Sequence, residues 1–444
     1  MAKKKTVFVC VSCGAESGAW SGKCLQCGEW NSIVEADTAP SKEAKATAVS
    51  LSQVNSDDVI RLKSGYREFD LVCGGGIVKG AVTLIGGEPG IGKSTLSLQI
   101  ANSFKTLYVS GEESPVQIRQ RADRLDIKKD NIMITTCTSV EGIEELIEKH
   151  KPECVFIDSI QTITSANMSA PAGSASQLRD SAIRLTAVAK KRNIPLFLIG
   201  HITKEGSIAG PKILEHVVDT VLYFEGDFNK EFRILRSFKN RFGSVNEIGL
   251  FTMTDRGLSE VKDKNSVFFS DDCFGSPGVA VGSAIEGSRS ILFEVQSLVS
   301  YTSFANPRRT ADGLDFNRLV IIAAALERYA ELKLSNYDIF INLAGGFSIN
   351  ETASDLAVAL SIASGYSNRS LPDRTGFLGE ISLAGEVRPV SQFERRITEF
   401  ERNNFSAVYV PAKNIKDKND LKVSLSIVPV KTIQEAIKKA FGEG

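Results

Sequence analysis

The most informative stretch of this chain is Gly86-Gly87-Glu88-Pro89-Gly90-Ile91-Gly92-Lys93-Ser94-Thr95. It follows the apolar run Ala81–Ile85, which predicts a strand, and it precedes Leu96–Asn102, which predicts a helix. A glycine-rich loop that ends in Gly-Lys-Ser between a strand and a helix has the full context of a P-loop. An ordinary glycine turn is the alternative, but every spacing of the motif and both flanks are met. The sequence therefore predicts a site for a nucleoside triphosphate.

The chemistry expected of this loop follows from its residue types. Glycines let backbone N–H groups turn inward around a polyphosphate, and the helix N-terminus adds its partial positive charge. We expect Lys93 to reach the β- and γ-phosphates and Ser94 to place its hydroxyl on Mg²⁺. The predicted nucleotide-binding residues are Gly87, Glu88, Pro89, Gly90, Ile91, Gly92, Lys93, Ser94 and Thr95.

Length and composition limit the number of domains and the class of protein. A chain of 444 residues is expected to hold two or three domains, and 42% hydrophobic with 24% charged residues is ordinary for a globular protein. No run of 18 apolar residues occurs, and the apolar run after Met1–Lys5 is too short for a signal peptide, so we expect no membrane span and a cytoplasmic location. The formal net charge is zero, so any DNA binding must come from local patches.

Four of the eight cysteines lie in two Cys-x-x-Cys pairs near the N-terminus, Cys10 with Cys13 and Cys24 with Cys27. Four thiolates suit tetrahedral Zn²⁺, and so short a segment needs such a staple to fold. A disulfide is disfavoured in a reducing compartment, while an iron site of the rubredoxin type stays open. Trp20 and Trp30, the two tryptophans of the chain, are either a miniature core or an exposed surface for a partner or a base.

Changes in composition predict the domain boundaries. Residues 1–34 form the four-cysteine zinc module, and residues 35–60, rich in Ala, Ser, Thr, Lys and Asp, form a flexible linker. Residues 61–265 form the nucleotide-binding domain, and residues 266–444 form a second α/β domain.

Strand-like runs alternate with helical stretches in the nucleotide-binding domain, which predicts a parallel sheet covered on both faces. The predicted strands are Ala81–Ile85, Thr106–Ser110, Ile132–Thr135, Cys154–Ile157, Pro195–Ile199 and Val217–Phe224. The predicted helices are Ser94–Phe104, Pro115–Leu125, Val140–Lys149 and Ser176–Arg192. Two antiparallel strands, Glu231–Phe238 and Glu247–Thr254, are expected to follow. Ligands of such sheets bind beyond the carboxyl ends of the strands, where the P-loop lies.

Three further features of this domain indicate hydrolysis. Asp158 ends the apolar strand Cys154–Ile157, as in a Walker B motif, and would hold the Mg²⁺ shell opposite Ser94. Glu112 follows the strand after the P-loop helix and would act on the attacking water; the alternative is that it caps the helix near Pro115. Lys239 and Arg241 sit at a strand end and would supply positive charge to a transferring phosphate, often across a subunit boundary; a solvated strand end is the alternative.

The P-loop, Glu112, Asp158 and above all the motif Lys239-Asn240-Arg241-Phe242-Gly243 resemble the bacterial RadA (Sms) family of DNA-repair proteins, ATPases of the RecA superfamily. The resemblance covers nearly the whole chain. It implies a RecA-like core that uses ATP, Mg²⁺ and Zn²⁺, a homo-hexameric ring, DNA-stimulated hydrolysis, and branch migration of recombination intermediates made by RecA. Single-stranded and branched DNA and RecA are the partners that it implies.

Within that resemblance, two loops are candidates for DNA contact. Thr164–Gln177 is small, polar and expected to be flexible, and His201–Lys212 follows the next strand. RecA-type folds place DNA-binding loops after these strands, which makes Arg179, Lys204 and Lys212 candidates for phosphate contact. Exposed loops without a DNA partner are the alternative.

The stretch Thr375–Val390 resembles the proteolytic domain of Lon, which uses a serine–lysine pair. The matching positions hold Ala353, with Ser354 one place off, and Glu394. A carboxylate cannot serve as the lysine does, so we expect a Lon-like fold without peptidase activity. A scaffold with added basic surface is the preferred interpretation; surface charge or subunit salt bridges are alternatives for its arginines, Arg308, Arg309 and Arg318.

The sequence thus predicts an α/β protein: a zinc ribbon, a RecA-like P-loop ATPase core and a Lon-protease-like domain. The function that we expect from the resemblance is that of a DNA-dependent ATPase and helicase that promotes branch migration. A filament-forming strand-exchange recombinase and an ATP-dependent protease are the alternatives.

Overall fold

The computed structural model describes residues 7–11, 15–36, 50, 60–201, 211–226, 232–261, 267–304, 306–346, 348–349, 351–415 and 423–442. The chain divides into two compact units, Met1–Asp58 and Val59–Gly444.

The first unit holds a three-stranded antiparallel sheet in the order β2-β1-β3, formed by β1 (Val7–Cys10), β2 (Glu16–Ser17) and β3 (Ile33–Ala36). Its small core consists of Cys10, Cys24 and Ile33, with two partly buried neighbours. Both tryptophans are exposed, so the interpretation of the tryptophans as the miniature core is wrong. The strand β3 runs two residues past the predicted end of the module at residue 34, and most of the predicted linker lies outside the described residues.

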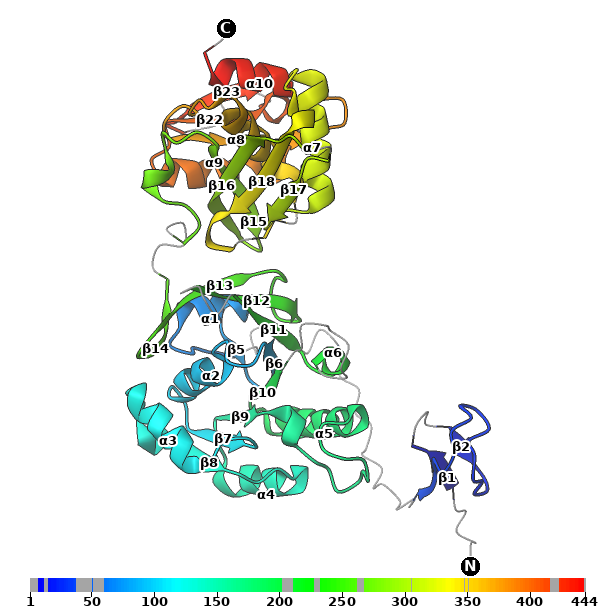
Figure 1. The fold of residues 1–444 in the computed structure, drawn as a ribbon. Coiled ribbons are helices and arrows are strands. Elements are labelled where there is room, and N and C mark those ends of the chain that lie inside the picture. Colours follow the sequence, from blue (N-terminus) through cyan, green and yellow to red (C-terminus); the bar gives the residue numbers. More distant parts are fainter. Residues whose placement is uncertain are drawn as a thin grey trace, which may run out of the picture. The chain divides into compact units, whose positions relative to one another are not determined.

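The second unit is built around two sheets (Figure 1). The first has nine strands in the order β14-β13-β12-β11-β6-β10-β9-β7-β8. Its parallel strands, from β6 to β11, are β6 (Val82–Gly87), β7 (Thr106–Ser110), β8 (Ile132–Thr135), β9 (Cys154–Asp158), β10 (Leu196–His201) and β11 (Thr220–Glu225). Three antiparallel strands complete it: β12 (Phe232–Asn240), β13 (Ile248–Thr254) and β14 (Gly257–Glu260).

Helices cover both faces of the nine-stranded sheet, as the alternating pattern predicts. One face packs on α1 (Arg67–Val72), α2 (Lys93–Ala101) and α3 (Pro115–Arg124). The other packs on α4 (Val140–His150), α5 (Ala175–Arg192) and the short α6 (Pro211–Leu214). The strands β6, β9 and β10 are buried because helices cover both faces of the sheet, which explains their continuous apolar runs. A short ladder of β4 (Arg61–Leu62) with β5 (Ile77–Val78) flanks the sheet.

The other sheet has seven strands in the order β17-β18-β16-β15-β19-β22-β23. Its strands are β15 (Val279–Glu286), β16 (Arg289–Tyr301), β17 (Arg309–Asp312), β18 (Tyr337–Leu343), β19 (Thr375–Phe377), β22 (Ala407–Pro411) and β23 (Ser426–Val430). The helices that accompany it are α7 (Phe316–Tyr329), α8 (Asp355–Ser367), α9 (Phe393–Arg402) and α10 (Ile433–Ala440).

One predicted element of this half is shorter than expected. The sequence predicts a hairpin over Gly376–Val387, and β20 (Glu380–Ile381) pairs antiparallel with β21 (Val387–Arg388) in that stretch. The first residues of the stretch belong to β19 instead, which pairs in parallel with β15 and β22 inside the large sheet. These residues are buried, so the sheet takes them up and the hairpin begins later in the chain.

Candidate active site

The P-loop joins the carboxyl end of β6 to the first turn of α2. Its backbone favours glycine at three points, because Gly87, Gly90 and Gly92 have φ values of 155°, 80° and 119°. A Cβ atom on Gly87 would come within 3.0 Å of the Cβ of Phe224, and one on Gly92 within 2.9 Å of the Met253 side chain. The loop therefore lies tightly between β11 and β13, with backbone N–H groups and the N-terminus of α2 at the same edge.

Lys93 lies folded over this loop. Its side chain is almost completely buried, and Nζ donates hydrogen bonds to the carbonyl oxygens of Gly87 (2.9 Å) and Glu88 (2.8 Å). Burial lowers the pKa of Lys93 to about 8, and the nearby carboxylates of Asp158 and Glu112 partly oppose this shift. A polyphosphate in the loop would offer this ammonium group full negative charges in place of neutral carbonyls.

Asp158 ends β9 at the same edge of the sheet. The buried hydroxyl of Tyr108 donates a 2.8 Å hydrogen bond to its Oδ2 atom, and burial with the charge of Asp158 raises the pKa of Tyr108 well above its usual value. Within the described residues, Oδ1 receives no side-chain hydrogen bond. Ser94 is half-buried in the first turn of α2. A carboxylate oxygen and a hydroxyl at one edge are oxygen ligands of the kind that Mg²⁺ takes, so these residues fit the ion.

Glu112 follows β7 and faces the same site. Its Oε1 atom accepts a hydrogen bond from the hydroxyl of Ser159 and lies 3.5 Å from Nε2 of His201. The alternative, a cap for the next helix, does not fit, because Ser114 caps α3 through a reciprocal capping box with Gln117. Glu112 is thus held at the same end of the sheet as the P-loop, and its carboxylate stays partly accessible to water.

His201 is a site residue that the sequence did not single out. It ends β10, between β6 and β9, and its Nδ1 atom lies 3.2 Å from Nζ of Lys93 while Nε2 approaches Glu112. The signal that could have found it is its place just after an apolar strand of a parallel sheet, where polar residues converge. His201 therefore links the lysine of the P-loop to the carboxylate expected to act on water.

The structure places Lys239 and Arg241 away from this group. Nζ of Lys239 donates to the carbonyl oxygens of Glu215 and Val218, and Arg241 pairs with Asp219 at 3.1 Å. Asp219 also accepts a hydrogen bond from the N–H of Val82, the first residue of β6. The P-loop begins at the last residue of that strand, roughly 17 Å away at 3.3 Å per residue. Within one chain, the two cations therefore lie near the amino-terminal end of β6, whereas the P-loop follows its carboxyl end.

The candidate DNA-contact residues differ in their exposure and in whether the structure describes them. Arg179 is exposed in the first turn of α5. The loop before it is tied down, because the buried Gln177 side chain bonds to the main chain of Ser165 and Ala170. Lys204 lies outside the described residues, and Lys212 lies in α6 with its side chain outside the description.

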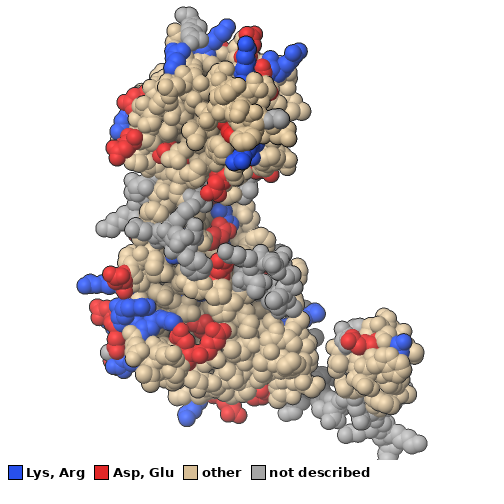
Figure 2. Space-filling model, viewed as in Figure 1, with Lys and Arg blue, Asp and Glu red and all other residues tan. Residues whose placement is uncertain are grey.

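The arginines of the seven-stranded half also differ from one another. Arg308 is exposed and stacks on Phe304, at 5.7 Å from the ring centroid. Arg309 donates to main-chain carbonyls of Leu334 and Tyr337, and Arg318 forms an ion pair with buried Asp355. On the face that Figure 2 shows, basic and acidic side chains are interspersed.

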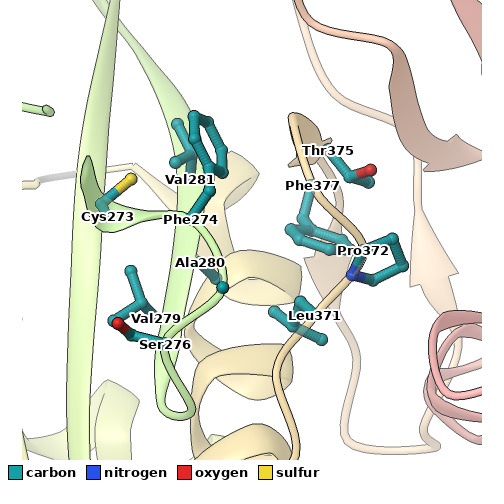
Figure 3. Close-up of a pocket in the computed structure, with 11 residues that line it drawn as sticks. Cys273, Phe274, Ser276, Val279, Ala280, Val281, Leu371, Pro372, Thr375 and Phe377 are labelled. Carbon is teal, nitrogen blue, oxygen red and sulfur yellow. The ribbon is translucent and has the colours of Figure 1, made fainter. Parts of the chain in front are cut away.

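At the two positions that the sequence compares with the serine and lysine of Lon, Ala353 is buried and Glu394 is exposed. The side chains beside them have other partners. Ser354 is buried and donates to the carbonyl oxygen of Ser283 at 3.3 Å. Arg396, two residues after Glu394, is completely buried and forms a bidentate ion pair with Glu351. Figure 3 shows a cavity in the same half, between Cys273–Val281 and Leu371–Phe377. Its volume is about 10 Å³, room for about one water molecule, so it is no substrate site.

The cysteine cluster fits a metal ion. The sulfur atoms of Cys10, Cys24 and Cys27 lie within 4.8 Å of one another, and those of Cys10 and Cys27 are 3.6 Å apart. Ligands at 2.3 Å from a tetrahedral ion would be about 3.8 Å apart. Backbone N–H groups of Cys27 and Gln26 lower the pKa of the Cys24 thiol, which favours the thiolate form. The predicted fourth ligand, Cys13, lies outside the described residues.

Removing the metal is expected to unfold the first unit alone. The substitution Cys10→Ser, or treatment of the full chain with a strong chelator, should release the ion, because the described core of this unit is little more than its cysteines and Ile33. The near-ultraviolet circular dichroism of tryptophan should collapse, since both tryptophans of the chain, Trp20 and Trp30, lie in this unit. Far-ultraviolet dichroism should change little. Retention of one ion per chain in the Cys10→Ser protein would contradict the assignment, and elemental analysis decides between zinc and iron.

Three family models match the chain. The KaiC ATPase model matches residues 62–259, and a model described as a rubredoxin metal binding domain matches residues 8–35. The model of subunit ChlI of Mg-chelatase matches residues 318–414. The chain thus carries a RecA-like α/β ATPase core and an N-terminal zinc-ribbon-type metal-binding module, as the sequence predicts.

Curated relatives match the chain from end to end. DNA repair protein RadA of Listeria monocytogenes is 44% identical and covers 99% of both chains. RadA of Bacillus subtilis is 43% identical over 100% of both chains, and RadA of Streptococcus pyogenes is 46% identical over 99% of this chain and 100% of its own.

Solved structures resemble one part of the chain. The RadB recombinase is 22% identical, with a TM-score of 0.37, and covers 45% of this chain and 100% of its own. A KaiC-like protein from Pyrococcus horikoshii is 19% identical, with a TM-score of 0.39, and covers 46% and 99%. Similarity at this level carries no argument about function. In the part of the chain that the structure describes, no helix is both long and apolar enough to cross a membrane.

Proposed function

Because this chain belongs to the RadA family of DNA repair proteins, we propose that it is a DNA-dependent ATPase and helicase that promotes branch migration of recombination intermediates. The observation that carries the proposal is the convergence of Lys93, Asp158, Glu112 and His201 at one edge of the nine-stranded sheet. These side chains supply the charge, the metal ligand and the carboxylate that hydrolysis of a nucleoside triphosphate requires.

Each residue has a distinct part in the proposed hydrolysis. Lys93 would exchange its two carbonyl partners for phosphate oxygens, and Ser94 with Asp158 would hold Mg²⁺, which neutralises phosphate charge when bound. Glu112 would accept a proton from the attacking water. His201 lies between Lys93 and Glu112, so its contact with the lysine would change when the lysine binds phosphate.

The proposal extends to assembly and partners. A homo-hexameric ring in the cytoplasm, acting on single-stranded and branched DNA together with RecA, is the arrangement that we propose from the family resemblance. The exposed Arg179 and Arg308 are the described candidates for DNA contact. We also propose that residues 266–444 act as a Lon-like scaffold without peptidase activity, which the burial of Ser354 and Arg396 supports.

The test is ATP hydrolysis with and without single-stranded DNA, combined with unwinding of a forked substrate by the full chain. We expect stimulation by DNA and ATP-dependent unwinding. Hydrolysis without any response to DNA would overturn the proposal. Electron microscopy separates it from the recombinase alternative, because a motor of this kind forms closed rings and a recombinase forms helical filaments.

The substitution Arg241→Ala is expected to impair DNA-coupled work far more than nucleotide binding. Its guanidinium group lies at the edge of the sheet opposite the P-loop of its own chain, so its loss cannot disturb that chain's phosphate contacts. We expect branch migration and DNA-stimulated turnover to fall at least about tenfold, as for a charge that contacts a transferring phosphate. Nucleotide affinity should stay within about twofold. The matched control is Arg328→Ala, an exposed arginine on α7. Normal branch migration by the Arg241→Ala protein would show that the coupling role is wrong.

A further inference from the structure

The end of the Lys239–Gly243 motif packs against the glycine turn that follows α1. A Cβ atom on Gly74, in this turn, would come within 2.9 Å of the Cα of Gly243, and one on Gly243 within 2.6 Å of the Cα of Gly74. Both distances are well below the separation of about 3.5 Å at which two carbon atoms pack. The two backbones therefore meet directly, and the contact leaves no room for a side chain at either position.

Hydrogen bonds hold the motif against the same region. Nη2 of Arg61 donates a 2.7 Å hydrogen bond to the carbonyl oxygen of Phe242, and Nδ2 of Asn240 donates a 3.3 Å one to the carbonyl oxygen of Val72. The N–H of Phe242 donates in turn to Oδ1 of Asn240, at 2.9 Å. We call Arg61, Val72 and Gly74 the motif seat.

The seat holds the residues on both sides of a cation. Arg241 lies in the chain between Asn240 and Phe242, and its own N–H donates a 3.2 Å hydrogen bond to the carbonyl oxygen of Asp219. A shift of the seat would therefore move the backbone from which the Arg241 side chain projects. Within the motif, Asn240 and Gly243 serve attachment, whereas the two cations carry the charge.

Arg61 is an unfavourable choice for stability alone. Its Nη1 atom is buried and has no hydrogen-bond partner among the described residues, and the bond that Nη2 makes is to a neutral carbonyl oxygen. A buried cationic nitrogen without a partner costs folding free energy. Residues that break this rule are concentrated where a protein positions or binds something.

We propose that Arg61 and Gly74 are positioning residues for the Lys239–Gly243 motif, which they fix so that Lys239 and Arg241 project at one defined place. The inference rests on the proposed function, because it needs the coupling role of Arg241. It assigns a part in the reaction to two residues that precede the P-loop in the chain.

Two neighbouring glycines provide a matched pair of variants. Gly74 and Gly75 both have left-handed backbone, with φ values of 80° and 103°, so alanine strains the backbone at either position. A Cβ atom on Gly75, however, has no neighbour closer than 3.9 Å. We expect Gly74→Ala to lower DNA-stimulated turnover at least about tenfold, because misplacement by about 1 Å can cost about 100-fold. Gly75→Ala should stay within about twofold of the unmodified chain. Equal turnover of the two variants would overturn the role of Gly74.

A double variant tests whether Arg61 acts through the motif. Arg61→Ala should lower kcat with DNA while KM for ATP stays within about twofold, and Arg61→Lys, which keeps one donor, should restore part of the loss. In a chain that already carries Arg241→Ala, the further change Arg61→Ala should have no effect, because the group that it positions is gone. If the two losses multiply instead, Arg61 acts elsewhere and the inference is wrong.

Hydrogen exchange separates the inference from the proposed function. In the full chain, the amides of Arg241 and Phe242 should exchange at least about tenfold faster in Arg61→Ala and Gly74→Ala, and at the normal rate in Gly75→Ala. Unchanged exchange in all three variants would overturn the seat, whatever the chain does with ATP. Faster exchange in a chain whose turnover never responds to DNA would support the seat and contradict the proposed function.

Discussion

Replacing Lys93 by alanine is expected to lower ATP turnover by at least about 100-fold, the loss typical of removing one preorganised donor from a developing charge. The ammonium group already lies against the carbonyl oxygens of Gly87 and Glu88, so it needs no large movement to meet a phosphate. No other lysine or arginine is seen on the described P-loop, so another side chain is not expected to replace it. Steady-state turnover at saturating ATP and Mg²⁺ measures the effect.

The loss should not come from unfolding. Burial lowers the pKa of Lys93, which means that the charged form is destabilised in the folded chain without a ligand. The thermal unfolding midpoint of the Lys93→Ala protein should therefore stay close to that of the unmodified chain. The matched control is Lys191→Ala, an exposed lysine on α5, which should leave turnover unchanged. Turnover of the Lys93→Ala protein within about twofold of normal would remove Lys93 from the phosphate site.

The substitution Glu112→Gln is expected to reduce turnover by about 10²- to 10⁴-fold, the range found for general acid–base groups. Glutamine keeps the shape of the side chain and can still accept the hydrogen bond from the Ser159 hydroxyl. It cannot take a proton from water. Nucleotide affinity should change by no more than about threefold, because Glu112 lies beyond the P-loop that binds the phosphates.

A single-turnover measurement separates chemistry from binding in this variant. The protein should form its nucleotide complex normally and then hydrolyse it slowly. Glu145→Gln is the matched control, since Glu145 is exposed on α4 at a distance from the P-loop strand. A normal single-turnover rate in the Glu112→Gln protein would place the acceptor of the proton elsewhere, with His201 as the nearest described group.

The strands and helices around the P-loop were largely predictable. The strands β7 and β8 have the predicted ends, and α3 and α4 differ from prediction by one residue each. Buried parallel strands read as short apolar runs, and helices as longer periodic ones. The edge strands β14 and β17 were not predicted, because each has four residues, which is too short for a clear pattern.

The site was only partly predictable. Asp158 and Glu112 could be named because each directly follows an apolar strand at a recognisable distance from the P-loop. Tyr108 and His201 could not, since their importance comes from which strands are neighbours: β7 beside β9, and β10 between β6 and β9. Strand order in a sheet is not written in local sequence, because it results from long-range burial of all the strands together.

The P-loop, the alternating α/β pattern, the cysteine pairs and the family resemblance could all be recognised in the sequence, because each depends on residue types at short, fixed spacings. The tertiary structure alone decided that His201 bridges Lys93 and Glu112, and that the tryptophans lie on the surface. It also decided that Lys239 and Arg241 lie at the far edge of their own sheet. That placement follows from the antiparallel return of β12 along β11, which carries the end of the strand back to the start of β6.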